Sequence, residues 1–119
     1  MSRDHRKLRV FAMSDALVVD IYKATKTFPA DERFGLQSQM RRAAVSAVSN
    51  IVEGSARRTT GEYVNFLNVA NGSAAEVRYL VDLSERLGYL PAASRERLFL
   101  GYSDLMKGLQ KLISSLMSA

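Results

Sequence analysis

The sequence predicts an all-α protein, an antiparallel up-down-up-down four-helix bundle. Three observations support this fold class: apolar residues recur every three or four positions through four segments, no useful stretch alternates with period two, and the connecting segments are short. The chain has 119 residues, of which 47% are apolar and 24% charged. That length suits one hydrophobic core, so we expect residues 1–119 to form a single domain.

The first helix is expected from about Leu8 to Lys26. It should end before Phe28-Pro29, because the residue preceding a proline is biased away from the helical conformation. Residues 30–33 then form a short connector or a single turn. The expected buried face of this helix comprises Phe11, Leu17, Val18, Ile21, Tyr22 and Thr25.

The second helix is expected from about Leu36 to Ala56, with two faces of different character. One face is apolar and small, and it contains Leu36, Met40, Ala43, Ala44, Ala47 and Ile51. The other is an unbroken polar stripe of Gln39, Arg42, Ser46, Ser49, Asn50, Glu53 and Arg57. Buried polar groups need partners. We therefore expect this stripe to meet another subunit, with Asn50 helping to specify the contact.

The third helix should begin near residue 60, because Thr59 followed by Glu62 has the spacing of a capping box. It should continue to Gly88 as the longest element. Gly72 is expected to face away from its apolar side, where it would let a neighbouring helix or subunit approach. After Tyr89-Leu90-Pro91, a fourth helix is expected from about Ala92 to Met117.

Composition excludes several classes of protein. The chain has no cysteine, which rules out disulfides, thiolate zinc sites and cysteine nucleophiles. No signal peptide and no run of eighteen apolar residues is evident, so we expect a cytoplasmic protein without a membrane span.

Enzyme chemistry has little support in the sequence. The only histidine is His5, at the N-terminus, so Glu-x-x-His metal pairs and a Ser-His-Asp triad cannot be built in the bundle. Glu53 and Glu76 could act as a carboxylate pair, but two such residues are far more often ion-pair partners. No glycine-rich phosphate loop is present. We expect no catalysis, no cofactor and no metal.

The net charge of +5 favours polyanionic partners. Basic residues gather in two places: residues 1–9, of which we expect 1–7 to be a loose basic arm, and residues 36–60, which hold Arg41, Arg42, Arg57 and Arg58. Arginine binds phosphate as well as carboxylate. The candidate nucleic-acid-binding residues are Arg6, Lys7, Arg9, Arg41, Arg57 and Arg58.

Each of these charges also has a purely structural interpretation. Arg42 could be held by Glu53 or Glu76, and Arg57 could pair with Glu53 four residues earlier, while the others are solvated. Anionic membranes also attract basic arms, but the apolar residues near the arm are needed by the core, which favours nucleic acid. Because no aromatic residues interleave the basic cluster, we expect little sequence preference.

A combination of motifs resembles a known family. They are Phe28-Pro29, Glu32-Arg33-Phe34-Gly35-Leu36, Gln39, Arg41-Arg42-Ala43-Ala44-Val45-Ser46, Asn50-Ile51, Glu53-Gly54, Phe66-Leu67, Ala70, Gly72-Ser73, Glu76 and Leu87-Gly88-Tyr89. Together they resemble the bacterial four-helix-bundle proteins encoded by intervening sequences of 23S ribosomal RNA genes. Departures occur at Phe11, Ala47-Val48 and Val52, where that family commonly has tryptophan, Ile-Pro and alanine.

The resemblance implies a four-helix bundle assembled as a ring, with a homopentamer as the expected state. The family is similar in fold to the accessory variability determinant of diversity-generating retroelements, a basic pentamer that binds nucleic acid and a reverse transcriptase. Neither a ribosomal nor a retroelement role transfers to this chain from the resemblance alone.

The leading hypothesis is a non-enzymatic basic oligomer that binds nucleic acid, RNA in preference, through phosphate contacts. Arg42, Asn50, Glu53 and Glu76 would organise contacts between helices or subunits. The alternative is a scaffold that binds an acidic or reverse-transcriptase-like protein. An enzyme centred on Glu53 and Glu76 is the third possibility.

Overall fold

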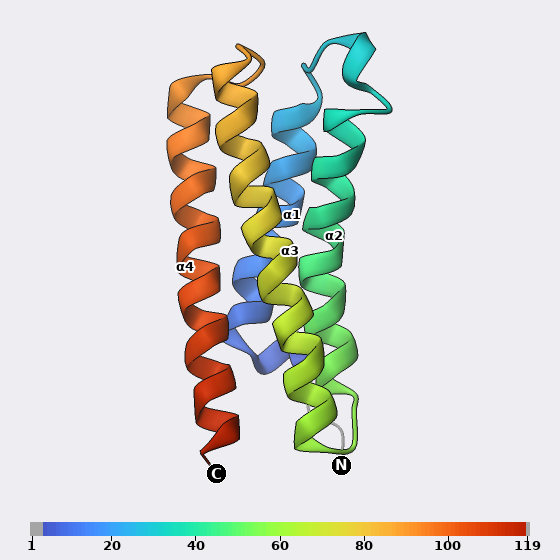
Figure 1. Ribbon diagram of the computed structural model, residues 1–119, viewed down its shortest axis with the longest axis vertical. Coiled ribbons are helices and arrows are strands. Elements are labelled where there is room, and N and C mark those ends of the chain that lie inside the picture. The colour runs from blue at the N-terminus through green and yellow to red at the C-terminus, as the bar shows by residue number, and fades with distance from the viewer. Residues whose placement is uncertain (1–3, 119) are drawn as a thin grey trace.

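The computed structural model describes residues 4–118 and contains, over that range, four α-helices and no strand. The helices are α1 (Arg9–Thr25), α2 (Leu36–Ser55), α3 (Thr60–Arg86) and α4 (Ala92–Met117). Two short 3-10 helices, η1 (His5–Lys7) and η2 (Ala30–Glu32), precede α1 and α2. The prediction of an all-α chain with four helices is confirmed. Successive helices run in opposite directions along a body of 45 × 23 × 19 Å (Figure 1).

Side-chain and backbone caps fix both ends of α3. The Thr59 hydroxyl oxygen accepts a hydrogen bond from the backbone N–H of Glu62 at 3.1 Å, as the capping-box spacing predicts. The Glu62 carboxylate accepts a hydrogen bond from the Thr59 hydroxyl at 2.9 Å. In a capping box the Glu62 side chain would instead accept from the backbone N–H of Thr59. At the other end Gly88 takes a φ of +80°, and the N–H of Tyr89 donates to the carbonyl of Ser84 at 2.9 Å. Glycine adopts this left-handed turn without strain.

The start of α2 depends on a carboxylate from η2. Glu32 accepts hydrogen bonds from the backbone N–H of Leu36 at 3.1 Å and from the Tyr89 hydroxyl at 3.2 Å. A Cβ at Gly35 would lie 2.8 Å from the Glu32 carboxylate, so a side chain there would disturb this cap. Burial, followed by the hydrogen bond to Glu32, raises the pKa of Tyr89. One carboxylate therefore links the α1–α2 connection to the α3–α4 connection.

The buried face of α1 differs in part from the expected one. Ile21 and Thr25 are fully buried as predicted, but Tyr22 is 40% exposed. The buried positions of α1 are Val10, Ser14, Ile21 and Thr25, which follow the helical spacing of three or four. Tyr22 comes one residue after the buried Ile21 and therefore lies outside this stripe.

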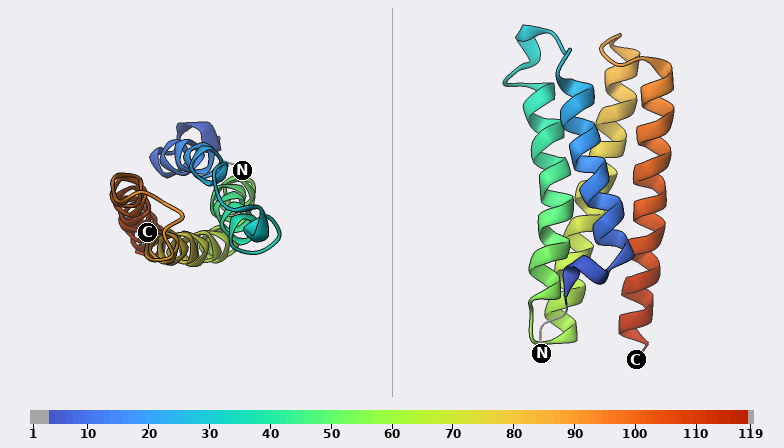
Figure 2. Two further views of the ribbon diagram at one scale, coloured as in Figure 1. Left: turned by 90° about the horizontal axis from the view of Figure 1, so that it is seen from above. Right: turned by 180° about the vertical axis from the view of Figure 1, so that it is seen from behind.

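Viewed along the bundle, the helices surround a common core in the order α1, α2, α3, α4, and α4 packs against both α3 and α1 (Figure 2). Ion pairs join neighbouring helices: Arg95 on α4 to Asp82 on α3 at 2.9 Å, and Arg97 on α4 to Asp20 on α1 at 3.1 Å. The hydrogen bond from Arg95 holds the pKa of Asp82 below its usual range. Because α1 has 17 residues and α4 has 26, the last turns of α4 extend beyond the start of α1 (Figure 1).

Only part of the predicted basic arm lies within the described residues. Residues 1–3 lie outside the described residues. Residues 5–7 form η1, whose N-cap Asp4 accepts a hydrogen bond from the backbone N–H of Arg6 at 3.0 Å. The His5 ring packs edge-on against Phe11, with centroids 4.8 Å apart. The described part of the expected loose arm therefore has a defined conformation.

Exchanging two glycines for alanine should have opposite outcomes. A Cβ at Gly54 would lie 2.9 Å from the Cβ of Phe66, so Gly54→Ala should push α2 and α3 apart and destabilise the fold by about 1–3 kcal/mol. Gly61 is the matched control, since a Cβ there meets nothing within 4 Å and alanine favours helix. Urea unfolding measures both. A Gly54→Ala variant as stable as wild type would contradict the close packing.

Candidate functional site: a polar groove and two arginine-bearing surfaces

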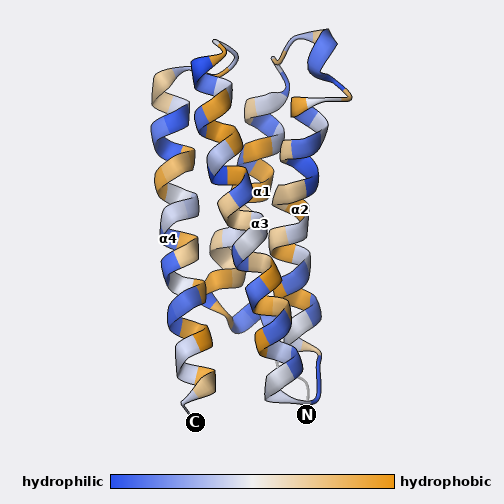
Figure 3. Cartoon of the chain, viewed as in Figure 1, coloured by the Kyte–Doolittle hydropathy of each residue, from blue (hydrophilic) through white to orange (hydrophobic). Residues whose placement is uncertain are grey.

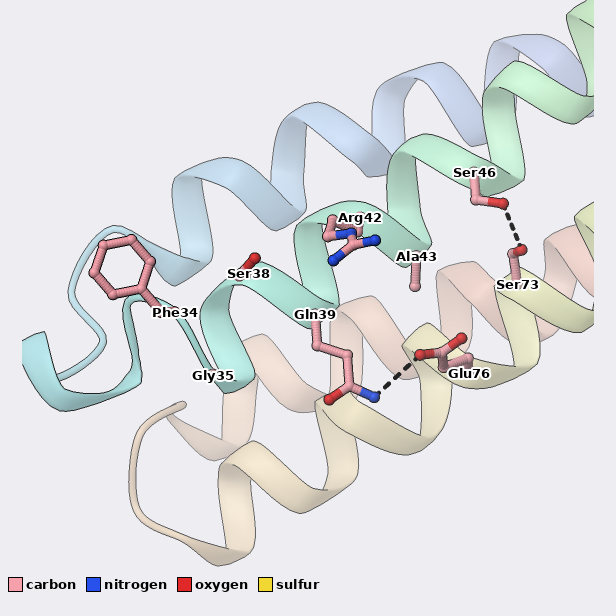
Figure 4. Close-up of a pocket in the computed structure, with 9 residues that line it drawn as sticks. All are labelled: Phe34, Gly35, Ser38, Gln39, Arg42, Ala43, Ser46, Ser73 and Glu76. Carbon is pink, nitrogen blue, oxygen red and sulfur yellow. Dashed lines mark hydrogen bonds between the residues drawn. The ribbon is translucent and has the colours of Figure 1, made fainter.

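The polar stripe of α2 lies beside α3, and the two helices enclose a shallow hollow of about 510 Å³ (Figure 4). Two hydrogen bonds cross the hollow. The hydroxyls of Ser46 and Ser73 are 2.8 Å apart, and the Gln39 amide donates to the Glu76 carboxylate at 3.2 Å. The stripe is thus a partly exposed polar contact between two helices of one chain, open on its outer side.

The residues expected to organise this stripe have separate partners. The Asn50 amide donates to the backbone carbonyl of Ser46 at 2.8 Å and to its hydroxyl at 3.1 Å. Glu53 forms an ion pair with Arg57 on the same helix. Arg42 lines the hollow, but no hydrogen bond or ion pair engages it within residues 4–118. The structure therefore brings Asn50 into a chain of hydrogen bonds with Ser46 and Ser73, and gives Glu53, Glu76 and Arg42 three different environments.

A basic surface lies at the end of the bundle that carries the α2–α3 connection. η1, which contains Arg6 and Lys7, packs against α2 and lies towards the same end of the bundle as the α2–α3 connection, which contains Arg57 and Arg58 (Figures 1 and 2). Arg6 is paired with Asp4 at 3.0 Å. Lys7 and Arg58 are exposed and make no side-chain hydrogen bond or ion pair with another described residue. We call these four residues the basic end.

Arg57 is held more tightly than a free surface cation. Its guanidinium lies 5.0 Å from the centroid of the Phe66 ring and pairs with Glu53. Its Nε is buried. The ring on which Arg57 stacks, Phe66, belongs to the next helix, so the sequence around Arg57 gives no sign of this contact. Arg57 therefore contributes to packing between α2 and α3, and Arg58 is the more available of the pair.

Arg41 lies apart from the basic end, and Arg9 lies beside it at the start of α1. The Arg41 guanidinium stacks 4.6 Å from the Tyr22 ring centroid, and donates to the Thr25 hydroxyl at 2.9 Å and the Tyr22 carbonyl at 3.2 Å. These contacts tie α2 to the end of α1. Arg9 lines a hollow of about 760 Å³ between α1 and α4, together with the apolar residues Leu8 and Val10.

The histidine and the two candidate carboxylates have separate partners in this arrangement. No group of three or more histidine, cysteine, aspartate or glutamate side chains suited to a metal ion occurs within the described residues. His5 contacts Phe11 rather than a carboxylate. Glu53 pairs with Arg57 and Glu76 accepts from Gln39, so the two carboxylates do not act on a common partner. Across residues 4–118, no helix is both long and apolar enough for a membrane span.

Comparison with known proteins agrees with the resemblance in the sequence. The family model described as 23S rRNA-intervening sequence protein matches residues 6–111. The chain is similar to a crystal structure from Bacteroides thetaiotaomicron, described as a protein with unknown function from the S23 ribosomal protein family, with a TM-score of 0.82. That match is 24% identical and covers 88% of this chain and 95% of the other, so it shows a shared fold. A comparison with curated proteins found no match.

The adjacent arginines Arg41 and Arg42 should respond differently to lysine. Lysine cannot reproduce the stacking and forked donation of Arg41, so Arg41→Lys should lower the free energy of unfolding by about 1–2 kcal/mol. Arg42→Lys should change it by less than about 0.5 kcal/mol, because no described residue bonds Arg42. Chemical denaturation of both variants measures the difference. Equal effects would contradict the structural assignment of Arg41.

Proposed function

Because the chain belongs to the 23S rRNA-intervening sequence protein family, we propose that it is a non-enzymatic basic bundle that binds nucleic acid, RNA in preference, through its phosphates. The observation that carries this proposal is the basic end. Two segments about fifty residues apart in the sequence, η1 and the α2–α3 connection, lie towards one end of the molecule (Figure 2), and both contain basic residues. Clustered cations release counterions from a polyanion on binding, which favours association.

The cations at the basic end have different roles in this proposal. Lys7 and Arg58 are exposed and unpaired among the described side chains, so they can reach phosphates at little cost. Arg6 must share its guanidinium with Asp4, and Arg57 with Glu53. Exposed ion pairs contribute little to stability, and their arginines retain unused donors for phosphate. Arg9 contributes long-range attraction from the neighbouring α1–α4 surface.

We further propose that the protein assembles with copies of itself, the homopentamer being the state that the family resemblance implies. The outer face of α3 supports assembly. Val69 is 52% exposed and Tyr79 57% exposed. Between them lies Gly72, where an added Cβ would meet nothing within 4 Å in the monomer. These positions and Glu76 lie three or four residues apart on one stripe beside the polar groove. A ring would also multiply the net charge of +5 per chain.

A second candidate function is a scaffold for an acidic protein partner. The hollow between α1 and α4 favours it, because apolar residues line it beside unpaired cations. Such a surface suits an amphipathic helix with acidic residues along its edges. The cations concerned are Arg9, Lys107 and Lys111, with Asp104 as the one acidic lining residue among those described.

Removing the two unpaired cations of the basic end should weaken binding to nucleic acid. We expect Lys7→Gln/Arg58→Gln to lower the affinity for structured RNA about ten-fold at ~0.1 M salt, and to reduce the slope of log K against log salt by about 1.4–1.8, because two phosphate contacts are lost. Fluorescence anisotropy of labelled RNA over several salt concentrations measures both quantities.

The matched control is Lys23→Gln/Lys26→Gln, which removes two exposed cations from the opposite end of the bundle. It should retain the wild-type slope. If wild type fails to bind at ~0.1 M salt, or the two double variants lose affinity equally, the basic end is not the binding surface and the protein-scaffold function becomes the better proposal.

A side chain at Gly72 should block assembly without harming the fold. Gly72→Gln fits the monomer and improves helix propensity, but it would prevent close contact with a second copy. Light scattering after size-exclusion chromatography should show dissociation towards monomer. Gly61→Gln, at an equally open position, should leave the assembly intact. A monomeric wild type, or an assembly indifferent to Gly72→Gln, would overturn this contact.

A further inference from the structure

The turn that leads into α2 contains one conspicuous exposed side chain, Phe34, which is 87% exposed. Its neighbours have clear roles in the monomer: Glu32 caps α2, and Leu36 is 8% exposed within the core. Figure 4 shows the Phe34 ring projecting beyond the start of α2, clear of that helix. No packing among the described residues explains an aromatic ring at this position.

A second hollow, of about 490 Å³, opens beside this ring on the α1–α2 side of the bundle. Its volume lies within the range of small-molecule sites. Guanidinium groups and aromatic rings dominate its lining, and no carboxylate contributes to it. The lining residues that matter are Tyr22, Arg33, Phe34, Ser38, Arg41 and Arg42. We call this hollow the arginine corner, and Figure 3 shows mostly hydrophilic colours over the turn and the upper part of α2.

The three arginines of the corner are available to different degrees. Arg41 is fixed by Tyr22 and Thr25, and these contacts use two of its five N–H donors. Arg33 lies 5.3 Å from the Phe34 ring centroid. Arg42 makes no hydrogen bond or ion pair with any other residue in the range 4–118. The corner thus offers one positioned guanidinium and two that can move towards a ligand.

An aromatic face beside several guanidinium forks matches the chemistry of an unpaired nucleotide. Bases stack on exposed aromatic rings and on arginine planes, and phosphates accept from guanidinium groups. Phe34 precedes α2, and Leu36 and Arg42 are separated by about 9 Å along the helix axis. A base on Phe34 and a phosphate at Arg42 would therefore belong to the same or adjacent nucleotides.

We propose that the arginine corner binds a nucleotide of single-stranded RNA, whose base stacks on Phe34 and whose phosphate is held between Arg41 and Arg42. This inference rests on the proposed nucleic-acid binding, and it adds a site at the opposite end of the bundle from the basic end. The adjoining hollow on the α2–α3 side contains the carboxylate of Glu76. Like-charge repulsion therefore directs the strand along the α1–α2 side.

The test uses a labelled octauridylate and an RNA duplex of random sequence, both titrated by anisotropy. Phe34→Leu keeps an apolar side chain but removes the ring, and it should weaken octauridylate binding about ten-fold while leaving duplex binding unchanged, because duplex bases are not free to stack. Arg42→Gln should lower the salt slope for octauridylate by about 0.7. The controls are Leu100→Ala, another exposed apolar side chain, and Lys111→Gln, another exposed cation, both of which should bind as wild type.

A tryptophan probe reports contact with the ring directly. The natural chain has no tryptophan, so Phe34→Trp introduces a single tryptophan at the corner, whose fluorescence can be followed by itself. We expect wild-type affinity and emission that octauridylate quenches. A second copy is the rival occupant, and it would produce emission that shifts to the blue with rising protein concentration and does not respond to RNA. That result would overturn the proposal.

The remaining outcomes separate this site from the proposed function as a whole. If octauridylate binds but Phe34→Leu and Arg42→Gln change nothing, the arginine corner is wrong while the response to Lys7→Gln/Arg58→Gln still supports binding at the basic end. If wild type binds neither RNA at ~0.1 M salt, the proposed function and this site fail together.

Discussion

The close approach of α2 and α3 is the constraint on which the rest of the bundle depends. Glycine and alanine line the seam, and at Gly54 the space is too small even for a methyl group, since a Cβ would lie 2.9 Å from Phe66. With so little side-chain volume between them, the two backbones approach closely and bury the larger apolar residues of both helices towards α1 and α4. Four alanines of the two helices are fully buried: Ala44, Ala47, Ala70 and Ala74.

This packing also decides the chemistry of the outer surface. A helix that buries small residues on one side must present its polar side outward. The Ser46–Ser73 and Gln39–Glu76 hydrogen bonds then bridge the polar groove between α2 and α3. The same rotation of α2 sends adjacent arginines to different places. Arg41 turns towards α1 and is used by the fold, while Arg42 turns towards solvent. The rotation of about 100° per residue along the helix therefore determines which arginine makes structural contacts and which remains available.

Much of the fold could be predicted from local signals. The expected start of α2 at Leu36 and both bounds of α4 agree with the structure, because breakers and periodic apolar residues mark them. The cap at Thr59 is likewise local in sequence. The candidate site was less predictable. Phe66 beneath Arg57, and Tyr22 beneath Arg41, come from neighbouring helices, and periodicity places a residue on a face without identifying what that face meets.

The sequence by itself determined the all-α class, the four helices and the family, since these depend on spacing, capping and short motifs read along one chain. Tertiary structure alone decided which charges are free. Arg41 stacks on Tyr22 and Arg97 pairs with Asp20, and these partners lie 19 and 77 residues away on another helix. The gathering of η1 with the α2–α3 connection, and of Tyr22 with Arg41, arises from packing between helices and so has no counterpart in the linear pattern.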